Sequence, residues 1–249
     1  MSGQIEGRIP VLEALRAGRE INKLLVAKGA KEGSIREVLG VAREAGVIIQ
    51  EVDRLRLDQL AEGRNHQGVI AMVAAHTYAE VEDIFAKAEA AGQDPLILVL
   101  DSIEDPQNLG SLIRTADAVG AHGIIIPERR AAGLTETVAK VSAGAVEYVP
   151  VARVTNIART LEELKERGVW VVGTHQDAKE LYHEARLTGP LAVVIGSEGK
   201  GIGRLVSEKC DFMVRLPMLG HVTSLNAAVA GAILVYEIRR QRDFATAKK

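Results

Sequence analysis

Three short segments of this 249-residue chain carry polar side chains at points where a buried strand is expected to end. The first, 108–114, holds an asparagine and an arginine. The second, 195–199, holds a glutamate among glycines, and the third, 216–226, holds a serine and an asparagine. Because ligands of open α/β sheets bind at the carboxyl ends of strands, these segments predict one assembled site. Its candidate chemical residues are Asn108, Arg114, Glu198, Ser224 and Asn226.

The first segment is typical of the start of a helix. Asn108 follows Pro106 and is well placed to cap that helix with its side chain. Arg114 lies off the apolar stripe formed by Leu109, Leu112, Ile113 and Ala116. For this segment alone, a capped helix with a solvated arginine is the better explanation than a catalytic role.

The second segment belongs to a glycine-rich run, 196–203, that fails two phosphate-binding templates. A P-loop has a glycine, then any four residues, and then Gly-Lys-Ser or Gly-Lys-Thr. The dinucleotide fingerprint needs a glycine where Arg204 stands. A tight turn from strand to helix is the plain alternative, although four glycines in eight residues also let backbone approach a ligand closely.

The third segment precedes the last helix. Thr223 or Ser224 is expected to cap that helix, which leaves Asn226 in its first turn, where asparagine is a poor helix former. Pro217 and Gly220 predict a shaped loop before the cap.

The elements that must position these segments alternate regularly along residues 95–249. Apolar runs predict strands over 96–100, 123–126, 147–151, 169–172, 191–195 and 212–216. Helical patterns lie between them, over 108–119, 134–142, 156–167, 203–209 and 223–241. The alternation predicts an α/β fold whose C-terminal sheet is mostly parallel, with helices on both faces.

The first part of the chain predicts a separate, smaller unit. Residues 1–76 form a small α/β domain, with strands over 21–27, 47–52 and 69–74 and helices over 8–18, 31–45 and 53–60. Residues 77–94 are expected to be a linker followed by a helix over 79–91.

Composition sets limits on partners and compartment. The chain is 47% hydrophobic and 26% charged, and its net charge is −2, so any contact with RNA must depend on local patches. Residues 1–76 carry a net charge of +1 and the remainder −3. A single cysteine, Cys210, excludes an intrachain disulfide, and no signal-peptide pattern precedes the first helix, so a cytoplasmic location is expected. The apolar run 227–236 is too short for a membrane span, and the six histidines show no metal-ligand spacing.

Taken together, the segments resemble a known family. Residues 101–117, 196–199 and 216–226 are similar to the three motifs of the SpoU/TrmH family of RNA ribose 2′-O-methyltransferases. Residues 7–15 and 65–68 resemble the substrate-binding domain of members that act on large-subunit rRNA. Within the family, the likeness is closest to the bacterial enzymes that methylate a guanosine ribose of 23S rRNA.

The resemblance implies a trefoil knot (the SPOUT fold) in the C-terminal domain, a homodimer, and S-adenosyl-L-methionine as cofactor, with no metal. It places the cofactor against backbone at six positions: Thr174, Ile195, Gly196, Leu216, Met218 and Leu225. It assigns RNA binding to the N-terminal domain, with Arg64, His66 and Gln67 as contacts.

The resemblance also implies roles. Arg114 is the family's proposed base, although an arginine stays protonated in proteins and a charged side chain can instead hold a phosphate and stabilise an alkoxide. Asn108, Ser224 and Asn226 would orient Arg114, ribose and cofactor, and Glu198 would fix its loop or bind Arg114. Three alternatives stay open: methylation of tRNA, a non-catalytic rRNA-binding factor on the same fold, and a nucleotide-binding α/β enzyme of different chemistry.

Overall fold

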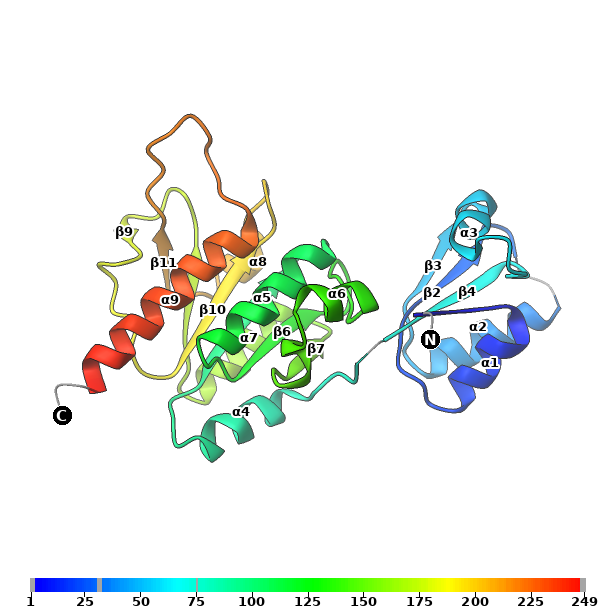
Figure 1. The fold of residues 1–249 in the computed structure, drawn as a ribbon, viewed down its shortest axis with the longest axis horizontal. Coiled ribbons are helices and arrows are strands. Elements are labelled where there is room, and N and C mark those ends of the chain that lie inside the picture. Colours follow the sequence, from blue (N-terminus) through cyan, green and yellow to red (C-terminus); the bar gives the residue numbers. More distant parts are fainter. Residues whose placement is uncertain (1–2, 31–32, 75, 247–249) are drawn as a thin grey trace. The chain divides into compact units, whose positions relative to one another are not determined.

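The computed structural model describes residues 3–30, 33–74 and 76–246, the last three of these by backbone alone. The chain divides into two compact units (Figure 1). The smaller comprises residues up to Thr77 together with Gly133–Glu136, and the larger comprises Tyr78–Ala132 and the chain from Thr137 onward.

The smaller unit is a four-stranded sheet with three helices. Its elements are β1 (Gln4–Glu6), α1 (Arg8–Arg16), β2 (Ile21–Ala27), α2 (Ser34–Glu44), β3 (Ile49–Val52), α3 (Arg54–Ala61) and β4 (Val69–Val73). The strand order is β1-β4-β2-β3, in which β2 and β3 are parallel and β4 is antiparallel to both of its neighbours. Strand β1 was not predicted, because three residues are too few to show alternation.

The larger unit is a seven-stranded, fully parallel sheet in the order β7-β6-β5-β10-β8-β11-β9. Its strands are β5 (Leu96–Asp101), β6 (Gly123–Pro127), β7 (Val151–Val154), β8 (Trp170–Thr174), β9 (Glu180–Leu181), β10 (Leu191–Gly196) and β11 (Phe212–Arg215). Its helices are α4 (Val81–Ala90), α5 (Pro106–Ala118), α6 (Glu136–Val141), α7 (Ile157–Glu166), α8 (Arg204–Ser207) and α9 (Ala227–Thr246), with a short 3₁₀ turn at Ala145–Glu147.

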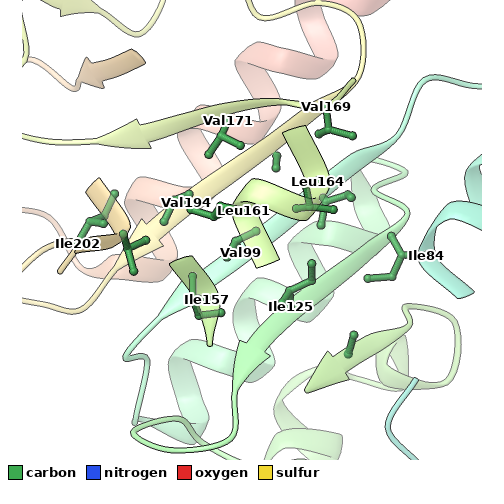
Figure 2. Packing of buried hydrophobic residues seen from close by; sticks show 14 residues of the cluster. Ile84, Val99, Ile125, Ile157, Leu161, Leu164, Val169, Val171, Val194 and Ile202 are labelled. Carbon is green, nitrogen blue, oxygen red and sulfur yellow. The ribbon is translucent and has the colours of Figure 1, made fainter. Parts of the chain in front are cut away.

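Helices cover both faces of this sheet, as the sequence predicted. On one face, α4 and α7 bury Ile84, Leu161 and Leu164 against Val99 and Val194 (Figure 2). On the other, α5 and α9 lie side by side (Figure 1), and a Cβ added at Gly231 of α9 would collide with Ile195 and Leu112. The central strands are buried throughout because both faces are covered, which explains their continuous Val/Ile/Leu runs.

Helix α4 belongs to the larger unit, because its Ile84 lies in that unit's core. From Ala79, which pairs with Ala152, the chain that leads into α4 already lies on the sheet of the larger unit.

The strand predicted over 147–151 is wrong. The chain forms a 3₁₀ turn at Ala145–Glu147 after two left-handed residues, Ala143 and Gly144, and the strand follows only at Val151–Val154. The buried residues Ser142, Val146 and Val149 recur at helical spacing, which the β-branched composition concealed. The two-residue strand β9 was also missed, since it is too short to leave a pattern.

Strand register brings the ends of four segments together. Asp101 at the end of β5 pairs with Gly196 at the end of β10, Gly173 of β8 pairs with Val194, and Thr174 pairs with Val214 of β11. The loops that follow β5, β8, β10 and β11 therefore leave the same edge of the sheet.

Candidate active site

Helix α5 begins two residues before the predicted cap. Asp105 is the N-cap, and its Oδ1 accepts from Gln107 N at 2.9 Å, with Pro106 in the first helical position. The prediction that Asn108 caps this helix is therefore wrong. Its side chain is buried inside the first turn and is directed to another segment of the chain.

The last helix also begins later than predicted. Its cap is Asn226 and not Thr223 or Ser224: the Asn226 Oδ1 accepts from Ala228 N at 3.0 Å and from Val229 N at 3.2 Å. An asparagine that looked out of place within a helix is thus a favoured residue at its boundary. The cap leaves the Asn226 amide group free to bond elsewhere.

A single carboxylate oxygen joins the three segments. Glu198 Oε1 accepts from Asn108 Nδ2 at 2.9 Å, from Asn226 Nδ2 at 2.5 Å and from Ala227 N at 3.4 Å. Asn226 Nδ2 also donates to Asn108 Oδ1 at 2.8 Å. Charge-assisted bonds of this kind are stronger than neutral ones, so the network fixes the three segments against one another. We refer to Asn108, Glu198 and Asn226 as the amide–glutamate network.

Glycines of 196–203 are required for two reasons, close backbone contact at Gly196 and a left-handed backbone at Gly199 and Gly201. A Cβ at Gly196 would lie 2.1 Å from the Gly201 carbonyl carbon, and the Ser197 and Gly201 backbones exchange two hydrogen bonds of 3.2 and 2.9 Å. Gly199 and Gly201 take φ of 79° and 66°, and a Cβ on either would meet no atom within 4 Å. The loop is thus closed on itself and exposes bare backbone to open space.

Asp101 is a residue of this site that the sequence suggested only as a capping group before α5 and not as a site residue. Asp101 is only 9% exposed. Its Oδ2 accepts from Gly203 N at 2.7 Å, and its Oδ1 accepts from the Ser102 hydroxyl at 3.1 Å. It therefore ties the glycine loop to the end of β5. A lone aspartate ending an otherwise apolar strand was the signal in the sequence.

The loops enclose a cavity of about 250 Å³. Glu198 and Ser224 line it. So do all six positions predicted to contact a cofactor, namely Thr174, Ile195, Gly196, Leu216, Met218 and Leu225. The described lining also includes six polar residues that the sequence did not assign to the site, namely His175, Gln176, Ser197, Lys200, Arg215 and Thr223. Nothing in their spacing distinguishes them from ordinary polar residues.

The cavity combines apolar walls with exposed peptide groups. Ile195, Leu216, Met218 and Leu225 supply apolar surface, and Gly199 and Gly201 supply unobstructed backbone. This lining suits a purine with a polar tail, because apolar contact holds the ring and backbone groups read its edge.

Arg114 lies on α5 six residues after Asn108, with an exposed side chain outside the lining of the cavity. Its guanidinium makes no ion pair or hydrogen bond with the residues that the structure describes. The suggested pairing of Glu198 with Arg114 is therefore not found, since Glu198 Oε1 bonds to the two asparagines. The charge of Arg114 remains available to a ligand.

The predicted RNA contacts of the smaller unit differ in accessibility. Gln67 is exposed, and Arg64 is half-exposed, with an ion pair to Glu6 at 3.0 Å. His66 is 5% exposed: its Nδ1 accepts from Gly68 N at 3.0 Å and its Nε2 lies 2.8 Å from Asp58 Oδ1. Both ring nitrogens are thus used to shape the loop that presents Gln67.

Two further features bear on ligands. Over the described ranges, no group of three or more His, Cys, Asp or Glu side chains is arranged to hold a metal ion. None of the helices traced in the structure combines the length and apolarity that crossing a membrane requires.

Two family profiles match the chain. That of the SpoU rRNA Methylase family covers residues 95–236, and that of the RNA 2′-O ribose methyltransferase substrate-binding domain covers residues 4–79. A Bacillus subtilis protein named as a TrmH family tRNA/rRNA methyltransferase, YacO, is 56% identical over 237 residues, 95% of each chain.

Solved structures agree. The SpoU methyltransferase AviRb from Streptomyces viridochromogenes, in complex with AdoMet, is 27% identical with a TM-score of 0.62, covering 97% of this chain and 90% of its own. An AdoMet-bound rRNA methyltransferase from Sinorhizobium meliloti is 27% identical with a TM-score of 0.59, covering 95% and 86%.

The chain belongs to the SpoU/TrmH family of RNA 2′-O-methyltransferases, enzymes that use S-adenosylmethionine. The predicted α/β fold, with its parallel C-terminal sheet and its N-terminal substrate-binding domain, is confirmed. The trefoil knot follows from likeness to the solved SpoU structures and not from strand order.

Proposed function

We propose that this chain transfers a methyl group from S-adenosylmethionine to the 2′-hydroxyl of a guanosine ribose in 23S rRNA. The observation that carries the proposal is the amide–glutamate network, in which Glu198, a residue of the cavity lining, accepts hydrogen bonds from Asn108 and Asn226. Three segments separated by up to 118 positions are thereby held in one geometry.

The cavity is the proposed cofactor site. Bound S-adenosylmethionine supplies a methyl group on a positively charged sulfur, so the leaving group needs no acid catalyst. Backbone at Thr174, Ile195 and Gly196 and the loop from Leu216 to Leu225 would hold it. Fixing the donor in this way contributes to rate by bringing it into line with the acceptor oxygen.

Arg114 is the proposed catalytic residue. A 2′-hydroxyl is a weak nucleophile, and its oxygen gains negative charge as the proton leaves. A positively charged guanidinium without an internal partner can stabilise that charge and hold a neighbouring phosphate through its planar fork. The hydroxyl of Ser224, in the wall of the cavity, would orient the ribose.

The choice of rRNA rests on the similarity to an rRNA methyltransferase of known structure. The Sinorhizobium relative is an rRNA methyltransferase, and the likeness covers 95% of this chain and thus both units. The substrate-binding profile over residues 4–79 further supports RNA binding by the smaller unit, for which we propose Arg64 and Gln67 as contacts, with His66 shaping their loop. A shortened chain beginning at Ala79 should bind S-adenosylmethionine normally and lose methylation of rRNA.

Methylation of tRNA is the second candidate, because the name of the Bacillus relative includes both substrates. Incubating the purified chain with methyl-labelled S-adenosylmethionine and either 23S rRNA or bulk tRNA separates the two. We expect label in the 23S rRNA. Label in tRNA alone would replace the proposed substrate, and no label together with no calorimetric binding of the cofactor would refute the enzyme.

We further propose a cytoplasmic homodimer built on α9 and the loop before it. Apolar side chains are exposed there: Leu219 by 98%, Tyr236 by 53% and Val229 by 47%. A second copy covering them would remove this surface from water. Val229→Asp should give monomer or aggregate by light scattering, and an unchanged dimer would count against this interface.

A further inference from the structure

The smaller unit contains a second cavity, of about 710 Å³, far more basic than the first. Its described lining includes three cationic side chains, Arg8, Lys28 and Arg54, and no carboxylate. The other lining residues are Ile9, Ala27, Gly29, Ala30, Ser34, Gln67 and Gly68. We call it the basic cavity. Except for Gln67, none of its residues has been given a role above.

Three helices begin at this cavity. Arg8, Ser34 and Arg54 are the first residues of α1, α2 and α3 and all line it. The N-terminal amides and the helix dipole carry positive partial charge, so three converging N-termini favour an anion. None of the three N-cap residues, Gly7, Gly33 and Asp53, caps its helix with a side chain.

The arginines stand where helix stability disfavours them. Cations are destabilising in a first turn and acidic residues are stabilising, yet α1 and α3 each begin with arginine and have no acidic residue in that turn. The Asp53 carboxylate lies beside the helix end but pairs with Lys28 at 2.9 Å. Because this placement of arginines at helix N-termini opposes local stability, it indicates a functional site.

Arg8 is held in position. Its Nε donates to the Gln67 carbonyl at 3.0 Å, its Nη1 donates to Ser34 Oγ at 3.3 Å, and its backbone N donates to Gln67 Oε1 at 3.1 Å. Gln67 keeps its carbonyl there by adopting a left-handed conformation, with φ of 49°. Strained backbone of this kind is typical of binding sites. Arg54, by contrast, is exposed and unpaired among the described residues.

We propose that the basic cavity binds a phosphate of the RNA backbone, with the exposed charges of Arg54 and of Lys28, which also pairs with Asp53, around the fixed Arg8. Ile9, 66% exposed at the same cavity, gives apolar surface for the adjoining sugar or base. This inference rests on the proposed function, because it names where the substrate's backbone is held.

Arg54→Gln tests the site on the full chain, and Arg16→Gln is the matched control. Arg16 lies at the opposite end of α1, and its substitution removes the same charge from the same unit. We expect Arg54→Gln to weaken binding of a 23S rRNA fragment by about tenfold and to lower the slope of log K against log salt by about one. The control should stay within twofold of wild type, and neither change should alter S-adenosylmethionine affinity.

Arg54→Gln should raise KM for RNA and leave kcat near wild type, since the residue is remote from methyl transfer. Equal weakening by Arg16→Gln and Arg54→Gln would reduce the effect to bulk charge and overturn the site. Calorimetric titration with inorganic phosphate distinguishes a free phosphate from a phosphate of the RNA backbone as the ligand. If Arg54→Gln abolished submillimolar binding of inorganic phosphate but left RNA affinity unchanged, the proposal that the cavity binds RNA would also be overturned.

Failure of the basic-cavity inference and failure of the proposed methyltransferase function give different results. A chain that methylates rRNA while Arg54→Gln binds it as tightly as wild type overturns only this inference. A chain that binds rRNA through Arg54 but transfers no methyl group refutes the proposed function and leaves the basic cavity in place.

Discussion

The two cavities hold their polar groups in opposite ways. Around the first, the amide–glutamate network satisfies its own donors and acceptors: Glu198 accepts three hydrogen bonds, and Asn226 both caps α9 and bonds to Asn108. Around the basic cavity, Arg54 and the starts of three helices present positive charge that no described side chain of its lining neutralises.

The difference separates two tasks. A satisfied network is rigid before any ligand arrives, which suits a site that must align two reacting atoms. An unsatisfied positive surface gains stability only when an anion binds, which suits recruitment of a polyanion. Substitutions in the first should therefore alter rate and cofactor binding, whereas substitutions in the second should alter RNA affinity and its salt dependence.

The largest effect is expected at Arg114. Arg114→Ala should reduce methyl transfer by about 10²-fold or more, because it removes the charge that we propose acts on the acceptor oxygen, while calorimetric affinity for S-adenosylmethionine stays within a few-fold. Arg114→Lys keeps charge but loses the planar fork. Recovery of rate in the lysine variant as pH rises would support a base, and inactivity at every pH would support bidentate positioning.

The network itself is broken by Glu198→Gln, which replaces an acceptor facing two amide donors with a side chain that is partly a donor. We expect methyl transfer to fall about tenfold, the scale of losing one charge-assisted hydrogen bond. Glu208→Gln is the matched control, an exposed glutamate paired with Arg204 on α8. Equal activity of the two variants would remove the network from the mechanism.

Asp101→Asn sharpens the comparison, because Asp101 acts through the loop and not on a ligand. Asparagine keeps an oxygen that can accept from Gly203 N but lacks the charge that strengthens this hydrogen bond, which should loosen the glycine loop and raise KM for S-adenosylmethionine about threefold to tenfold, with a smaller change in kcat. Asp117→Asn on exposed α5 surface is the control. A fall in kcat with unchanged KM would contradict a positioning role.

The smallest effect concerns stability of the unit that carries the first cavity. Burial, and then the charges of Arg242 and Lys87, lower the pKa of His122 to about 4 from 6.5, and its Nδ1 accepts from Leu96 N at 2.9 Å. Between these values the unfolded chain binds the proton and the folded chain does not, so stability falls as pH falls from 6.5 to about 4. Over that range the free energy of unfolding, measured with denaturant, should fall by about 1–3 kcal/mol more in wild type than in His122→Asn. If the free energies of unfolding of the two proteins changed in parallel with pH, His122 would not be the group responsible.

Much of the fold could be predicted because buried parallel strands have an unmistakable composition. The runs 96–100 and 191–195 fall almost residue for residue on β5 and β10. The strand at 147–151 failed because Val146 and Val149 are β-branched residues packed at helical spacing. Propensity and periodicity disagreed there, and periodicity decided the structure.

At the site, residue types were easier to predict than partners. The sequence indicated that Asn108, Glu198 and Asn226 belong together, but it assigned the caps to the wrong residues. Helix boundaries depend on which of several adjacent polar side chains turns back onto the backbone, and the segment from Asp105 to Asn108 offers two candidates. Asp101 was passed over because its partner, Gly203, lies 102 positions away.

The most direct measurement is the chemical position of the transferred methyl group. The purified chain is incubated with 23S rRNA and S-adenosylmethionine, and the product is treated with alkali and analysed by mass. A methyl group on the 2′-oxygen blocks cleavage of the adjoining phosphodiester, so we expect one alkali-resistant dinucleotide beginning with 2′-O-methylguanosine, absent with Arg114→Ala. A methylated base in a fully alkali-sensitive product would contradict ribose transfer by this site.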